Sequence, residues 1–74
     1  MQFDNIECLI DGEGTIEVGR LGPFPCAATA VDSSSQLAGL VRRDNETLLE
    51  LLKRLDTAIG KAWDEDDFTD ELNG

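Results

Sequence analysis

Carboxylates are the side chains of this sequence with the most capacity for chemistry, and they concentrate towards its C-terminus. Residues 64–74 hold six of the sixteen acidic residues and no basic residue. Two carboxylates can share acid–base catalysis only where a cleft separates their pKa values, and a chain of 74 residues leaves little room for one. Histidine and tyrosine are absent altogether. The residue types therefore predict that the protein is not an enzyme.

The same acidic run has the wrong spacing for a calcium-binding loop. Asp64 and Asp66 match the first and third ligand positions, but Phe68 stands at the fifth, where an oxygen ligand is needed. The two cysteines, Cys8 and Cys26, lie among apolar residues and are too few for a zinc site in a chain without histidine. They are expected to be reduced thiols that pack as small hydrophobic residues. No metal and no cofactor is expected.

The net charge of −10 is distributed unevenly along the chain. Residues 1–63 carry ten acidic and six basic residues, a net charge of −4, whereas residues 64–74 contribute −6. Such a chain is repelled by nucleic acids and by anionic membranes, so a charged partner is expected to be a basic protein surface. The residues expected to contact that partner are the acids of the C-terminal segment and its two hydrophobic residues: Asp64, Glu65, Asp66, Asp67, Phe68, Asp70, Glu71 and Leu72.

These two hydrophobic residues leave the role of the segment open. Phe68 and Leu72 are four positions apart, so both would lie on one face of a short helix that forms on contact with a partner. Alternatively, residues 64–74 are a flexible acidic tail that stays in solvent and adds only charge. The sequence is compatible with either interpretation.

An amphipathic helix that could position this segment is predicted over residues 47–63. Thr47 and Glu50 have the spacing of a capping box, which satisfies the first free amides of a helix. Gly60 is unfavourable in a helix interior by about 1 kcal/mol. Apolar residues nevertheless continue the pattern beyond it, and the whole face is expected to pack on the domain's own sheet. Its members are Leu48, Leu51, Leu52, Leu55, Ala58, Ile59, Ala62 and Trp63.

Three or four strands are predicted before this helix. Residues 2–10 and 15–21 alternate between apolar and polar, and the glycine-containing residues 11–14 between them predict a hairpin. Residues 26–31 are apolar on both faces, which indicates a strand in the middle of a sheet or at a subunit interface. Residues 36–43 fit a strand or a helix, and the strand is preferred because the run is short.

These elements predict an α+β fold. An antiparallel sheet of three to four strands packs on one C-terminal amphipathic helix, in a single domain of residues 1–63 followed by the acidic tail. The run Asn45–Leu51, which follows an apparent strand, resembles the passage from strand to helix in HicB-like antitoxins. That resemblance implies a three-stranded antiparallel sheet packed against the helix, and it supports the architecture alone.

The favoured function is a small protein-binding module without catalytic activity. Its charge suits it to cover a basic, nucleic-acid-binding surface of another protein, as antitoxins, phage-encoded inhibitors and DNA mimics do. The alternative is a self-assembling structural or accessory subunit, a homodimer whose interface includes residues 26–31. The chain starts at Met1 without a signal sequence or a long apolar segment, so a complete cytoplasmic protein is expected.

Overall fold

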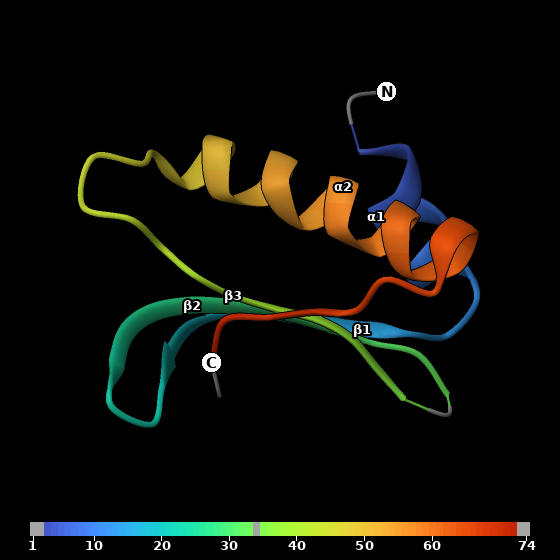
Figure 1. The fold of residues 1–74 in the computed structure, drawn as a ribbon, viewed down its shortest axis with the longest axis horizontal. Coiled ribbons are helices and arrows are strands. Elements are labelled where there is room, and N and C mark those ends of the chain that lie inside the picture. The colour runs from blue at the N-terminus through green and yellow to red at the C-terminus, as the bar shows by residue number, and fades with distance from the viewer. Residues whose placement is uncertain (1–2, 34, 73–74) are drawn as a thin grey trace.

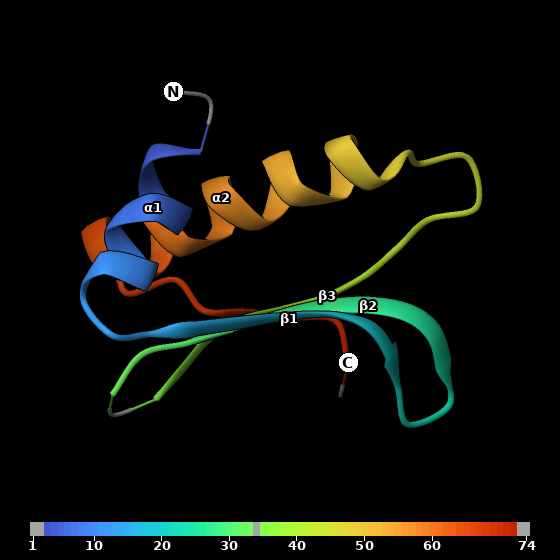
Figure 2. The same ribbon diagram turned by 180° about the vertical axis from the view of Figure 1, so that it is seen from behind.

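The computed structural model describes residues 3–33 and 35–72, which form two layers. A four-stranded sheet makes one layer, and two helices cover one of its faces (Figure 1 and Figure 2). The predicted α+β class is confirmed. Gln2, in the predicted first strand, and residues 73–74 of the predicted tail lie outside the described residues. In chain order the elements are α1 (Asp4–Asp11), β1 (Thr15–Leu21), β2 (Phe24–Val31), β3 (Gln36–Val41), α2 (Leu48–Glu65) and β4 (Thr69–Asp70).

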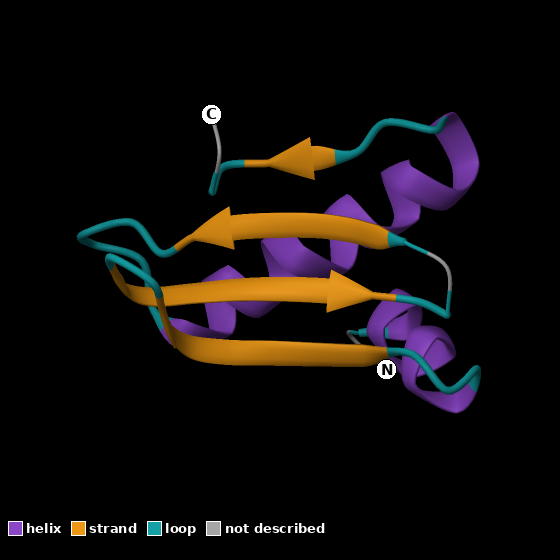
Figure 3. Cartoon of the chain, turned by 90° about the horizontal axis from the view of Figure 1, so that it is seen from below, coloured by secondary structure: helices purple, strands orange, loops and turns teal. Residues whose placement is uncertain are grey.

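The sheet has the strand order β1-β2-β3-β4. The first three strands are antiparallel to their neighbours, as predicted, whereas β4 runs parallel to β3 through two residue pairs (Figure 3). The preferred interpretation of residues 36–43 as a strand is confirmed over Gln36–Val41. Strand β2 lies between β1 and β3, and Ala27, Ala28 and Ala30 are fully buried by contacts within one chain. That burial gives no reason for a second copy, and the homodimer stays a prediction.

Helix α2 begins with the predicted capping box. The Thr47 hydroxyl accepts a hydrogen bond from the Glu50 amide at 3.1 Å, and the Glu50 carboxylate accepts one from the Thr47 amide at 2.8 Å. The helix runs through Gly60 to Glu65, two residues beyond its predicted end. Neither helix in the described part of the chain combines the length and the apolar character needed to cross a membrane.

The core lies between α2 and the alanine-rich middle of the sheet. Small side chains at Ala28 and Ala30 let the backbone of the helix approach the sheet, so its larger side chains fill the space between the layers. The predicted apolar face is correct at its centre but too wide, because Leu48 and Trp63 remain 46% and 42% exposed. The residues of α2 that are buried are Leu51, Leu55, Ala58, Ile59 and Ala62.

The prediction of a strand over residues 2–10 is wrong, because Asp4–Asp11 form helix α1. Apolar residues in this segment recur every second position, which favoured a strand, but Ile6 and Leu9 also have helical spacing. The helix buries Leu9 in the core, while Ile10 is 46% exposed. Contacts with α2, which no local pattern encodes, stabilise this second arrangement: the Asp56 carboxylate accepts a hydrogen bond from the Ile6 amide at 2.9 Å.

The predicted turn at residues 11–14 is therefore the C-terminal end of a helix. The Gly12 amide donates to the Cys8 carbonyl at 3.0 Å, and the Gly14 amide donates to the Leu9 carbonyl at 2.8 Å. Strand β1 instead forms its hairpin with β2, across a turn in which Gly22 has a φ of 56°. Glycine adopts this left-handed conformation without steric cost.

Gly60 offers a test of how α1 is held against α2. A Cβ atom at Gly60 would lie 2.7 Å from Asn5 Nδ2, which donates a hydrogen bond to the Asp56 carbonyl at 3.0 Å. In the Asn5→Ala background, Gly60→Ala should raise the free energy of unfolding by about 1 kcal/mol, the helix preference of alanine over glycine. In the wild-type background the gain should be smaller or reversed, because Asn5 must move. Urea denaturation of the four proteins in this double-mutant cycle measures the difference; equal effects in both backgrounds would show that Asn5 does not constrain Gly60.

Candidate functional site

The strand register brings acidic residues from distant parts of the chain to one end of the molecule. Thr15, Val31 and Gln36 are paired neighbours at that end, and α1 precedes it while α2 finishes there. The α1–β1 turn and the last turn of α2 therefore lie at the same end of the sheet (Figure 1). We call the exposed carboxylates of these two segments the acidic end: Asp11, Glu13, Asp64, Glu65, Asp66 and Asp67.

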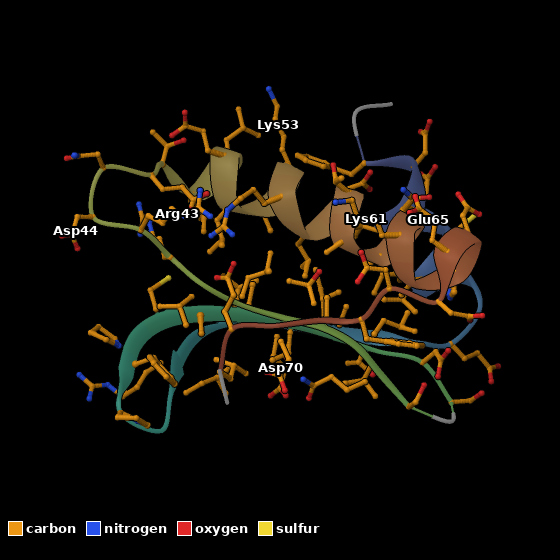
Figure 4. The ribbon with its side chains drawn as sticks, in the orientation of Figure 1. Arg43, Asp44, Lys53, Lys61, Glu65 and Asp70 are labelled. Atoms are coloured by element: carbon orange, nitrogen blue, oxygen red, sulfur yellow. The ribbon has the colours of Figure 1, made fainter. Side chains whose placement is uncertain are left out.

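Three of the six basic residues lie towards the opposite end. Arg20 is next to the β1–β2 turn, and Arg42 and Arg43 follow the last residue of β3. Figure 4 shows Arg43 and Asp44 at one extreme of the molecule and Glu65 near the other, beside α1. The fold thus separates charges along the direction of the strands and concentrates negative charge at one end.

Large hydrophobic side chains are exposed beside these carboxylates. Trp63 lies in the last turn of α2 and is 42% exposed, and Phe68 follows the acidic loop and is 52% exposed. Ile10, in the last turn of α1, is 46% exposed. Aromatic residues flanked by charges are typical of protein-binding surfaces, because they bury a large apolar area at contact.

The residues predicted to bind a partner extend over two parts of the fold, the end of α2 with its loop and the edge of the sheet. Asp64 and Glu65 extend α2, Asp66 ends it with a φ of 54°, and these residues are exposed together with Asp67 and Phe68. The chain then turns back along the sheet, where Thr69 and Asp70 form β4 and Asp70 remains exposed. The last two residues of the predicted site, Glu71 and Leu72, are partly buried on the sheet.

The anticipated helix across Phe68 and Leu72 is not present in this structure. The Glu71 amide donates to the Gly39 carbonyl at 2.7 Å, which continues the β4 alignment with β3. Leu72 packs so closely over Gly39 that a Cβ atom there would lie 3.0 Å from Leu72 Cδ1. Within residues 64–72, Asp64 and Glu65 are the last residues of α2, and Thr69 and Asp70 form β4.

Arg54 links this C-terminal segment to the rest of the domain. Its guanidinium bonds both oxygens of Glu46, at 2.6 Å from Nε and 2.9 Å from Nη2. Nη1 reaches the Glu71 carboxylate at 3.0 Å, and Nη2 also donates to the Val41 carbonyl at 2.9 Å. The side chain of Glu46 is only 8% exposed. Through these bonds, the guanidinium of Arg54 connects the loop before α2, strand β3 and the C-terminal segment.

The electrostatics of this cluster are dominated by the same pair. Hydrogen bonding from Arg54 lowers the pKa of Glu46 from 4.5 to about 2, with help from the Arg43 amide and against the effect of burial. The pKa of Arg54 is raised above its usual value, chiefly by its bond to Glu46. Each group stabilises the charged form of the other. In this structure the donors of Arg54 bind Glu46, Glu71 and the Val41 carbonyl of the same chain, so the cluster stabilises the fold.

Sequence reasoning missed both the Arg54 cluster and the contribution of α1 to the acidic end. Asp11 ends helix α1 and Glu13 follows it, so both lie just before Thr15 at the start of β1. Asp4 and Glu7 in the first turn of α1 were the available signal, since acids are favoured at helix N-termini. The Arg54 contacts span up to seventeen positions along the chain, and no local spacing indicates them.

Within residues 3–33 and 35–72, no group of three or more cysteine, aspartate or glutamate side chains is arranged to hold a metal ion. The geometry thus defines a small acidic α+β protein with one strongly anionic end. No protein-family model matches this chain, and neither the curated proteins nor the solved structures include a significant match to it. The likeness to HicB-like antitoxins rests on residues 45–51 alone.

Proposed function

We propose that this protein is a non-enzymatic binding module whose acidic end docks on a basic surface of a partner protein. The observation that carries the proposal is the convergence of six exposed carboxylates from two segments that are more than fifty positions apart in the chain. Lys61 is the one basic residue in positions 55–74. A partner that normally binds nucleic acid would present the complementary charge.

The exposed hydrophobic residues give the acidic end more than long-range attraction. Carboxylates accelerate the encounter with a basic surface, whereas buried apolar anchors slow dissociation. Trp63 and Phe68 lie beside the carboxylates on the last turn of α2 and on the loop that follows it. They are the residues we expect to be buried at contact. Leu72, which already packs on Gly39, is no longer expected to be an anchor.

An oligolysine peptide is a suitable probe, because its charge is basic and its sequence carries no other information. In two-dimensional NMR titrations, we expect the amides of residues 11–14 and 64–68 to shift most. The variant Glu65→Gln with Asp67→Asn should weaken binding roughly two- to tenfold at low salt. The shifts should fade above about 0.15 M salt, where the Debye length falls to about 8 Å.

The matched control removes two exposed carboxylates elsewhere, by Glu17→Gln with Asp44→Asn. It has the same net charge as the test variant, so its affinity should stay close to that of the wild type. Equal weakening in both variants would mean that net charge alone attracts the peptide and that the acidic end is not a site. The same pair of variants then separates specific from non-specific basic proteins captured from a host lysate.

A further inference from the structure

The outer edge of β3 is occupied by a very short segment of the same chain. Residues 69–72 lie along it, and only Ala38–Thr69 and Gly39–Asp70 are paired as ladder residues. We call residues 69–72 the edge segment. A strand of two residues contributes few backbone hydrogen bonds, so most of its attachment must come from side chains.

The side chains of the edge segment alternate between the two faces of the sheet. Thr69 and Glu71 face α2, where Glu71 bonds Arg54 at 3.0 Å and accepts a hydrogen bond from the Val41 amide at 2.9 Å. Leu72 faces the opposite, helix-free side, where it borders a hollow with Thr29 and Val31. Three contacts thus hold the segment. Arg54 binds the Glu71 carboxylate, Leu72 packs over Gly39, and the Glu71 amide donates to the Gly39 carbonyl.

The fit on the α2 side is incomplete. A hollow of about 340 Å³ lies between β4 and α2, and the short side chain of Thr69 leaves it unfilled. Besides Thr69 and Glu71, its boundaries are formed by Leu40 and Ala58 and by the polar residues Lys53, Arg54, Thr57 and Lys61. An apolar residue in place of Thr69, two positions before the carboxylate, would point into this hollow and bury more surface.

The edge segment joins the domain through a single exposed loop. It follows an exposed loop that begins at Asp66, a non-glycine residue with a φ of 54°, and the Glu71 side chain is 33% exposed. If it left the sheet, it would uncover the Gly39 carbonyl, the Val41 amide and one side of Arg54. An exposed strand edge with free donors and acceptors binds extended peptides by strand addition.

We propose that the β3 edge is a receptor for an extended segment of a partner protein, and that residues 69–72 occupy it in competition. The partner segment has an apolar residue, any residue, a carboxylate and a second apolar residue in succession. The first fills the hollow beside Leu40, the carboxylate binds Arg54, and the last replaces Leu72. This surface differs from the acidic end, and the inference does not depend on the proposed function.

Blocked synthetic peptides with the sequence of residues 66–72 test the proposal against the full-length protein. The peptide carrying Thr69→Leu should bind about tenfold more tightly than the native sequence, because a leucine enters the apolar hollow. The peptide carrying both Thr69→Leu and Glu71→Gln should lose that binding. Amide shifts at Gly39 and Val41 in NMR titrations report occupation of the edge itself.

The intramolecular competitor is weakened by Leu72→Ala in the full-length chain. We expect this variant to bind the Thr69→Leu peptide several-fold more tightly than the wild-type chain does, since the edge segment no longer competes as well. If the variant unfolds, the affinities of the Thr69→Leu peptides with and without Glu71→Gln for the wild-type chain still test the proposal. Absence of binding to either chain, or equal binding of the carboxylate and glutamine peptides, would overturn the proposal. Shifts confined to the acidic end would do so as well.

Discussion

Replacing Leu55 by alanine is expected to lower the free energy of unfolding by about 2–5 kcal/mol. Leu55 is completely buried at the centre of α2, where it packs between the helix and the sheet. The substitution removes apolar contacts and leaves a cavity that alanine-rich β2 cannot fill, because its own side chains are too short to move in. A domain of 74 residues has little stability to spare, so this loss should be plain in chemical denaturation.

The matched control is Leu49→Ala in the same helix. Leu49 is 48% exposed, so its truncation should change the free energy of unfolding by less than about 1 kcal/mol. Leu52, which is partly buried, should fall between the two. If Leu49→Ala and Leu55→Ala shift the urea midpoint equally, the side of α2 that faces the sheet has been assigned incorrectly.

Helix α2 was predictable because its signals are local. Thr47 and Glu50 satisfy each other's backbone across three positions, and the apolar face repeats within the helix itself. The position of β2 between two other strands was also predictable from the sequence, since a strand that is apolar on both faces must be covered on both sides. What could not be judged was how far the apolar face is covered: Leu48 and Trp63, near the two ends of the helix, remain 46% and 42% exposed.

The apolar pattern alone could not decide helix α1 or strand β4, for the same physical reason. The choice between strand and helix over residues 4–11 depends on Asp56. Its carboxylate accepts a hydrogen bond from the Ile6 amide, fifty positions away in the chain. Strand β4 depends on Arg54 and Gly39, which bind Glu71 from α2 and β3. Four of the six carboxylates of the acidic end were therefore found, because charge is visible in sequence. The division of the C-terminal residues between the acidic end and the edge segment was not found.

Arg54→Met is expected to cost about 1–3 kcal/mol, the range for leaving partly buried hydrogen-bonding groups without their partner. Methionine keeps most of the stem, but it leaves the 8%-exposed Glu46 carboxylate and the Val41 carbonyl without the guanidinium. Arg54→Lys keeps the charge without the planar fork and should recover only part of this loss. Lys53→Met, which removes an exposed neighbouring charge, should change stability by no more than about 0.5 kcal/mol.

The same pair makes the effect of Arg54→Met depend on pH. The pKa of Glu46 is about 2 in the folded protein, against 4.5 for an unperturbed glutamate, so the unfolded chain takes up the proton first as pH falls. The stability that Arg54 contributes through Glu46 is therefore complete above about pH 4.5 and is lost as the pH approaches 2. Denaturation of wild type and Arg54→Met across this range should give two curves that converge towards low pH, because the variant has no guanidinium to hold Glu46 ionised. Glu46→Gln should flatten the wild-type dependence in the same window. Parallel curves for the wild type and Arg54→Met would mean that Glu46 titrates normally and that the guanidinium stabilises the fold only through packing and its bond to the Val41 carbonyl.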